Sequence, residues 1–177
     1  MTCEGTGIIH TIGHSTRSLE VFLDLLTSHQ VALLIDVRRW PMSRRHPHFN
    51  RESLSTALAE KAIGYLWRQD LGGFRKPAAD SPNSAWQVAS FRGYADFMLT
   101  SSFAAIMREI EPIAAEQPSA LMCAEAVPWQ CHRQLLADAF LVRGWHVRHI
   151  LHDGCSEHKL TAFARPEGTR IIYSGLI

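Results

Sequence analysis

Short apolar segments alternate along the chain with longer segments whose apolar residues recur at helical spacing. Nearly continuous aliphatic runs are typical of strands buried on both faces of a sheet, and such runs cover residues 8–14, 31–37, 65–67, 119–124 and 146–151. Helical periodicity predicts helices at residues 18–30, 50–62, 91–100, 102–116 and 129–143. Alternating strands and helices are typical of a parallel sheet covered by helices. We therefore expect an α/β fold, a single three-layer domain with a mostly parallel sheet of about five strands and helices on both faces.

Two segments fall outside this alternation. Residues 74–90 are rich in Pro, Ser and Ala and are predicted to form a long excursion. The C-terminal tail, residues 154–177, is weakly patterned, although residues 170–174 could add an edge strand. A chain of 177 residues has the length of one domain with a sizeable core, so we assign residues 1–177 to a single domain.

Charge and composition exclude several classes of protein. The formal net charge is only +1, so a preference for an anionic partner has to arise locally. No apolar run approaches the roughly 20 residues that span a bilayer, and residues 1–5 lack the basic and apolar regions of a signal peptide. We therefore expect a cytoplasmic protein with no membrane partner, in which all four cysteines are reduced and unbonded. The sequence specifies no cofactor, no metal and no oligomeric state.

Polar and ionisable residues follow nearly every predicted strand. In a parallel sheet the carboxyl ends of the strands meet at one edge, where ligands bind. His14 and Ser15 follow the first strand, and Asp36, Arg38 and Arg39 follow the second. The later strands are followed by Arg68, Asp70, Cys123, Glu125, Cys131, His132, Arg133, His149, His152 and Asp153. This coincidence predicts one site at that edge of the sheet.

The densest group of reactive side chains lies between the fourth predicted strand and the last helix. Two thiols, a carboxylate, an imidazole and a guanidinium occur within residues 123–133. Pro128 suits the first position of a helix, where a missing N–H is tolerated. We therefore expect Cys131 and His132 to lie in the first helical turn, where the helix dipole favours a thiolate. The same side chains also suit zinc or iron, although their spacing matches no common zinc finger.

A basic loop is predicted after the second strand. Residues 37–51 contain five arginines, two histidines and no acid, with aromatic side chains interleaved. Arginine forks match phosphate oxygens, and aromatic rings stack on bases. The loop is therefore predicted to contact a phosphate-bearing ligand or a nucleic acid, with Arg44 and Arg45 near its middle. The alternative is a solvated loop whose arginines pair with acids elsewhere.

Several short motifs occur in order along the chain: Thr11–Ser15, Asp36–Arg38 with Pro41 and Ser43, Phe49–Asn50, Leu71–Gly73, Phe91–Ala95, Cys123–Glu125 and Cys131–Arg133. Together they resemble the domain of unknown function 488 family. The resemblance covers about residues 8–153 and leaves out the tail. It implies a compact cytoplasmic α/β domain whose shared polar positions cluster together, and it implies no established reaction.

The layout also resembles that of rhodanese domains. Residues 34–38 look like the rhodanese strand that ends in Asp-x-Arg, and Cys123 takes the place of the catalytic cysteine after a later strand. The rhodanese loop is a short Cys-x-x-Gly-x-Arg cradle. Here Glu125 lies inside the loop, and Arg133 is ten residues from Cys123. A carboxylate in an anion cradle argues against persulfide or phosphate chemistry at Cys123.

From these features we expect a site that binds, and in the enzymatic case processes, an anionic phosphate-bearing ligand such as a nucleotide or nucleic acid. The expected substrate-binding residues are Ser15, Arg38, Arg39, Arg44, Arg45 and Arg133, with Arg38 and Arg133 on the phosphate. The expected catalytic residues are His14, Asp36, Glu125, Cys131 and His132. Glu125 or His14 would be the general base, or both would ligate a metal. Two alternatives are a thiol-based sulfur-transfer or redox enzyme at Cys123 or Cys131, and a non-catalytic nucleic-acid-binding module that uses the basic loop.

Overall fold

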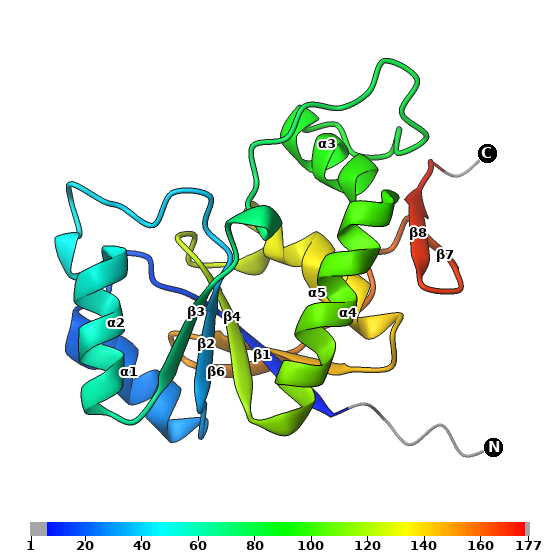
Figure 1. Cartoon of the computed structure of the whole chain (residues 1–177). Coiled ribbons are helices and arrows are strands. Elements are labelled where there is room, and N and C mark those ends of the chain that lie inside the picture. Colours follow the sequence, from blue (N-terminus) through cyan, green and yellow to red (C-terminus); the bar gives the residue numbers. More distant parts are fainter. Residues whose placement is uncertain (1–6, 176–177) are drawn as a thin grey trace.

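The computed structural model describes residues 7–175, which are built around a six-stranded sheet (Figure 1). The strands are β1 (Ile8–Gly13), β2 (Leu33–Asp36), β3 (Gly64–Trp67), β4 (Ser119–Cys123), β5 (His146–Leu151) and β6 (Gly154–Glu157). They lie in the order β3-β2-β4-β1-β5-β6, in which β1 to β5 are parallel and β6 is antiparallel to β5. The predicted α/β fold with a mostly parallel sheet is confirmed, with one strand more than expected.

Helices cover both faces of this sheet, as Figure 1 shows. They are α1 (Leu19–Ser28), α2 (Arg51–Glu60), α3 (Ala89–Met98), α4 (Ser101–Glu116) and α5 (Arg133–Leu141). One core packs α1 and α2 against one face and includes Ile12 and Phe22. The other packs α3, α4 and α5 against the opposite face and includes Ile35 and Leu136. Successive side chains of a strand point to opposite faces, so the aliphatic strands supply both cores and form the middle of three layers.

The last helix begins later than the sequence pattern predicts. Residues Pro128–Gln130 form a separate 3-10 turn, and α5 begins at Arg133. Cys131, between them, has an extended backbone with φ −143° and ψ 157°, and His132 is the N-cap of α5. The prediction that Cys131 and His132 lie in the first helical turn is therefore wrong. The proline begins its own short turn, for which a fixed φ and a missing N–H are equally suitable.

The C-terminal tail begins with β6, the antiparallel edge strand of the main sheet, and its last strand packs beside α3. Strand β7 (Ala164–Glu167) pairs with β8 (Arg170–Tyr173) in a separate two-stranded sheet. The strand predicted at residues 170–174 therefore exists, but it is not an edge of the main sheet. The Tyr173 N–H donates to Asn83 Oδ1 at 2.9 Å, and the Tyr173 carbonyl accepts from the Ala85 N–H at 3.0 Å. These bonds tie the excursion at residues 74–90 to the hairpin.

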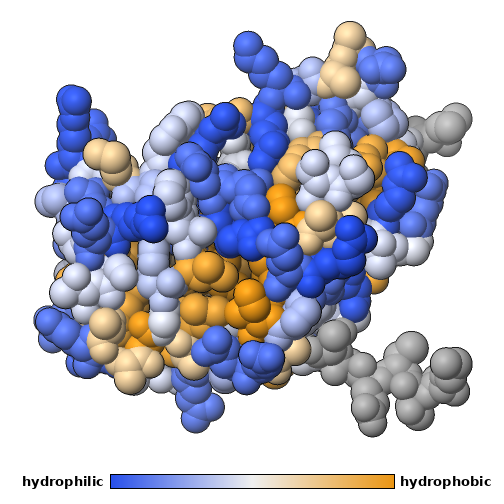
Figure 2. Space-filling view, viewed as in Figure 1, coloured by the Kyte–Doolittle hydropathy of each residue, from blue (hydrophilic) through white to orange (hydrophobic). Residues whose placement is uncertain are grey.

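The face shown in Figure 2 is mostly hydrophilic, with a hydrophobic area over the strands beside α4. Within residues 7–175, no helix is long and apolar enough to cross a membrane.

Candidate functional site

Two neighbouring cavities open at the carboxyl ends of β1, β2 and β4, the edge where the strand pattern predicted a site. The smaller cavity, of about 290 Å³, is lined by Cys123, Cys131 and His132 among others. The larger one, of about 560 Å³, is lined by residues that include His14 and Ser15. The two cavities share Arg38, Trp40, Glu125 and Gln130 in their walls. They therefore form two parts of one concave region.

Most of the predicted site residues line this region. Arg39 lies in the wall of the smaller cavity and Arg45 in that of the larger one. Three predicted residues line neither cavity: Asp36, Arg44 and Arg133. Asp36 and Arg133 are fully buried beneath it, and Arg44 is exposed outside it.

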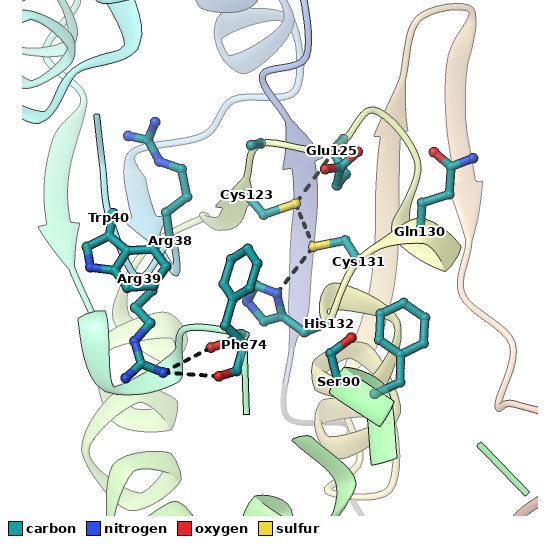
Figure 3. Close-up of a pocket in the computed structure, with 13 residues that line it drawn as sticks. Arg38, Arg39, Trp40, Phe74, Ser90, Cys123, Glu125, Gln130, Cys131 and His132 are labelled. Atoms are coloured by element: carbon teal, nitrogen blue, oxygen red, sulfur yellow. Dashed lines mark hydrogen bonds between the residues drawn. The ribbon is translucent and has the colours of Figure 1, made fainter. Parts of the chain in front are cut away.

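The central feature of the smaller cavity is a pair of thiols (Figure 3). Cys123 is the last residue of β4, and Cys131 reaches it from the extended segment before α5. Their sulfur atoms are 2.8 Å apart, less than 1 Å longer than a disulfide bond of about 2.0 Å. Both are free thiols with exposures of 2% and 6%. Cys155 is also free, and Cys3 lies outside the described residues.

Arg133 lies behind the thiols and is fully buried. Its Nε donates to Cys123 Sγ at 2.9 Å, its Nη1 to Thr11 Oγ1 at 3.0 Å and its Nη2 to the Glu125 carbonyl at 2.7 Å. Among residues 7–175, no carboxylate forms an ion pair with this guanidinium. A buried charge is costly unless an opposite charge compensates for it. Within residues 7–175, the ionisable side chain that accepts a hydrogen bond from Arg133 is the Cys123 thiol. This arrangement therefore favours a thiolate in the pair.

The two thiols have different proton affinities. Burial raises the pKa of Cys123 well above its ordinary value, and the hydrogen bond with Cys131 raises it further. Burial also raises the pKa of Cys131, but the hydrogen bond with Cys123 and the charge of Arg133 outweigh this effect, so that the pKa of Cys131 is lowered. Of the two thiols, Cys131 is therefore the one that loses its proton more readily, and Cys123 is the one that keeps it.

His132 adjoins the thiolate and also lines the smaller cavity. Its Nε2 lies 3.2 Å from the Val37 carbonyl oxygen, and its Nδ1 lies 3.4 Å from Cys131 Sγ. A carbonyl oxygen only accepts, so Nε2 carries the proton and Nδ1 presents its lone pair to the thiol. Burial lowers the pKa of His132. The imidazole is therefore neutral near pH 7 and holds a lone pair against the Cys131 thiol.

Asp36 and Arg38 form an ion pair beneath the cavity wall. Arg38 Nε and Nη2 donate to the two carboxylate oxygens of Asp36 at 2.9 and 2.6 Å. The hydroxyl of Tyr65 donates to the same carboxylate at 2.6 Å, and Arg38 Nη2 also donates to the Phe49 carbonyl at 2.9 Å. Asp36 therefore positions Arg38 and does not touch a ligand. The charge of Arg38 is already compensated, unlike that of Arg133.

A loop of residues 124–126 crosses directly over the end of β1. The His14 and Ser15 N–H groups donate to the Cys123 and Ala124 carbonyls at 3.0 and 2.9 Å. A Cβ atom on Gly13 would lie 1.6 Å from the Glu125 carbonyl oxygen, so only glycine permits this crossing. The Glu125 side chain is exposed and lies in the walls of both cavities. It is therefore placed at the opening, where it can contact a ligand.

His14 lies in the wall of the larger cavity, stacked on Phe49 with ring centroids 4.4 Å apart. Its Nδ1 donates to the Ser15 carbonyl at 3.0 Å. Burial lowers the pKa of His14 to about 4, so this imidazole is neutral near pH 7 and is a weak base.

The basic loop supplies the outer rim of both cavities. Arg39 Nη1 donates to the Gly73 and Phe74 carbonyls at 3.4 and 3.3 Å, as Figure 3 shows. The rings of Trp40 and Phe74 are 5.4 Å apart, and these side chains are 60% and 74% exposed. Phe74 also has a φ of +61°, which is uncommon for a non-glycine residue. Phe74 was not among the predicted site residues, because its only local signal in the sequence is the preceding Gly pair.

Thr11 and Gln130 are further residues near the site that the sequence analysis did not select. Thr11 could have been found as the one hydroxyl residue inside the aliphatic run of β1. Gln130 carried no signal of its own, because its place in the cavity wall depends on the turn at residues 128–130. Within residues 7–175, no group of three or more His, Cys, Asp or Glu side chains is arranged to hold a metal ion.

Comparison with known proteins identifies a family. The model of the family described as "Domain of unknown function DUF488" matches residues 18–140. No curated protein and no solved structure matches the chain. The matched segment contains both thiols, His132 and Arg133, and it excludes His14 and the C-terminal hairpin.

Proposed function

The chain belongs to the DUF488 family, and we propose that it is a thiol-dependent enzyme that exchanges disulfides at the Cys123–Cys131 pair. The observation that carries this proposal is the placement of two free thiols 2.8 Å apart in a cavity, against a buried arginine with no carboxylate partner among residues 7–175. Vicinal thiols with one stabilised thiolate are suited to attack a disulfide and then to resolve the product.

The reaction begins at the thiolate that the cavity exposes. The Cys131 thiolate attacks one sulfur of a substrate disulfide R–S–S–R′, so that a Cys131–S–R bond forms and R′–S⁻ leaves and takes up a proton. Cys123 then loses its proton and attacks the Cys131 sulfur. The Cys123–Cys131 disulfide forms, and R–S⁻ leaves and is protonated. The substrate gains two electrons and two protons; the protein supplies both electrons and the Cys123 proton, and the solvent supplies the second proton. An external dithiol reductant restores the pair by the reverse exchange.

The same geometry favours exchange over sulfur transfer. A persulfide on Cys131 would lie within reach of Cys123, 2.8 Å away from the parent sulfur. Attack by Cys123 would close the disulfide and release hydrogen sulfide, so the carried sulfur would be lost. The exposed carboxylate of Glu125 at the opening also disfavours an anionic persulfide.

Dithiobis(nitrobenzoate), an anionic aromatic disulfide, tests this proposal. A reduced protein carrying Cys3→Ser and Cys155→Ser should release two equivalents of nitrothiobenzoate and keep no adduct, because Cys123 resolves the first product. With Cys123→Ser added, one equivalent should be released and one should remain on Cys131, as mass spectrometry can detect. With Cys131→Ser added, the reaction should be slow because burial raises the pKa of the Cys123 thiol. An adduct that persists on the two-cysteine protein would contradict the mechanism.

A second candidate function is binding of an anionic, phosphate-bearing ligand such as a single-stranded nucleic acid along the basic loop. Arg44 and Arg45 are exposed, and neither forms an ion pair with a described residue. Trp40 and Phe74 add exposed rings on which bases can stack. Oligonucleotide binding that weakens steeply with salt and brings no turnover would favour this function. Arg133 does not contribute to it, since it is buried.

We infer a reducing compartment, the cytoplasm, as the place of action. A dithiol that works by exchange must be returned to its reduced form after each turnover. A count of four titratable thiols on unreduced, denatured protein isolated from the cytoplasm is the expected result. A Cys123–Cys131 bridge in that sample would place the protein in an oxidising environment or at the oxidised stage of its cycle.

A further inference from the structure

A continuous line of hydrogen bonds connects the thiols to the C-terminal tail. Arg133 Nη1 bonds to Thr11 Oγ1 at 3.0 Å, and Thr11 Oγ1 bonds to His149 Nδ1 at 2.7 Å. His149 Nε2 bonds to His158 Nδ1 at 2.9 Å, and His158 Nε2 bonds to Asp138 Oδ1 at 2.8 Å. All five residues are buried, none more than 6% exposed. This line therefore runs through the interior from the site to the tail.

The hydrogen atoms of this line have a consistent arrangement that starts from Asp138. Asp138 also accepts from the Tyr173 hydroxyl and the Thr161 N–H, at 2.8 and 3.1 Å, so it is an ionised acceptor. His158 then donates from Nε2 to Asp138, and with its Nδ1 as acceptor, His149 donates from Nε2 and accepts at Nδ1. Thr11 consequently donates to His149, and its lone pairs are left for Arg133. Burial lowers the pKa of His149 to about 3, so this imidazole is neutral near pH 7.

The line determines where the Arg133 guanidinium points. The Thr11 hydroxyl donates its hydrogen to His149, so its oxygen is free to accept a hydrogen bond from Arg133. The Glu125 carbonyl holds a second nitrogen at 2.7 Å, which leaves Nε directed at Cys123. We propose that Thr11, His149 and His158 are positioning residues that hold the Arg133 charge against the Cys123–Cys131 pair. The C-terminal segment would thus complete the thiol site from outside the residues that the family model matches.

This inference rests on the proposed function in one respect, which is that the Cys123–Cys131 pair is the reacting group. A purely structural network would stabilise the fold without affecting the thiols. The two roles differ in one measurable respect, the pH dependence of thiol reactivity. The charged and titratable groups that face the pair are Arg133, His132, Arg38, Arg39, Glu125 and Tyr94, and all of them can be kept unchanged.

The test cuts the line at a single atom. In the protein with Cys3→Ser and Cys155→Ser, Thr11→Val removes the hydroxyl and keeps the shape of a β-branched strand residue. Thr11→Ser keeps the hydroxyl. The measurement is the rate of Cys131 alkylation by iodoacetamide between pH 5 and pH 9, with melting temperatures alongside. Thr11→Val should move the midpoint up by about one pH unit, so that alkylation below the midpoint is about tenfold slower. Thr11→Ser should match the parent protein.

Tyr173→Phe is the matched control for stability. It removes a buried hydrogen bond to Asp138 but leaves the line itself intact, so it should lower the melting temperature without moving the midpoint. A folded Thr11→Val protein with the parent profile would overturn the proposal. If Thr11→Val does not fold, His149→Asn cuts the line one step further away, and an unchanged profile there overturns it equally. A parent midpoint at the ordinary thiol value would instead contradict the proposed function.

Discussion

Mild acid should destabilise this fold through histidines that are buried in their neutral form. Burial lowers the pKa of His14 from 6.5 to about 4, and that of His149 from 6.5 to about 3. Below pH 6.5 the unfolded chain binds protons at these positions while the folded protein does not. Their contribution to stability is therefore complete above pH 6.5 and is lost progressively as the pH falls through 6.5 toward the folded pKa values.

The magnitude follows from the difference in bound protons. Between pH 7 and pH 5, each histidine should lower the free energy of unfolding by about 2 kcal/mol, and the two together by about 4 kcal/mol. Burial also lowers the pKa values of His10 and His132, which adds a loss of the same sign. A typical domain has only about 5–15 kcal/mol of stability. For a chain of this size the melting temperature should fall by roughly 8–16 °C.

Urea unfolding at pH 7 and at pH 5, at constant ionic strength, measures this loss. His14→Gln should halve the loss of unfolding free energy that His14 and His149 together cause between pH 7 and pH 5. This result is expected whatever the variant does to the stability at pH 7. His152→Gln is the matched control at an exposed histidine and should leave the loss unchanged. Equal free energies of unfolding at the two pH values would refute the reasoning, because they would mean that His14 and His149 are solvated or charged in the folded protein.

Three further predictions concern the loop over β1, the Asp36–Arg38 ion pair and the basic loop. Gly13→Ala places a Cβ atom 1.6 Å from the Glu125 carbonyl oxygen and should cost about 3 kcal/mol or more in thermal unfolding, whereas Gly175→Ala, with open space around it, should cost little. Asp36→Ala leaves the buried guanidinium of Arg38 uncompensated and should cost about 3–5 kcal/mol in urea unfolding. The double variant Arg44→Ala with Arg45→Ala should keep the parent melting temperature. It should also flatten the salt dependence of oligonucleotide binding, by about one unit of log–log slope for each lost phosphate contact. An unchanged slope would mean that this part of the loop is only a solvated connector.

The main sheet could be predicted from the sequence because its strands are aliphatic and buried on both sides. Residues 119–123 and 146–151, for example, were located almost to the residue. Strands β6 and β7 could not be predicted in this way. Residues 154–157 are all exposed, and β7 contains Pro166, which is typical of edge strands and turns. Neither strand has the apolar pattern that marks burial.

The site could be predicted in its place but not in its internal arrangement. The rule that ligands bind at the carboxyl ends of parallel strands located both cavities. Pattern alone could not show that Cys131 is extended, because Pro128 begins a 3-10 turn and a helix equally well. Nor could it show which arginine points inward. The line through Thr11, His149 and His158 depends on contacts between residues up to 138 positions apart, which no local pattern records.

Arg38 and Arg133 both follow buried strands of the sheet, and both were expected to hold phosphate. They differ in whether a carboxylate compensates their charge. Arg38 is compensated by Asp36, at 2.6 Å, so it brings little net charge to the cavity that it lines. Arg133 is more deeply buried and has no carboxylate partner within residues 7–175. Desolvation makes an uncompensated guanidinium costly, and it also strengthens its attraction to any anion that it touches. The ionisable side chain to which Arg133 donates is Cys123, so the uncompensated charge of Arg133 acts on the Cys123–Cys131 pair.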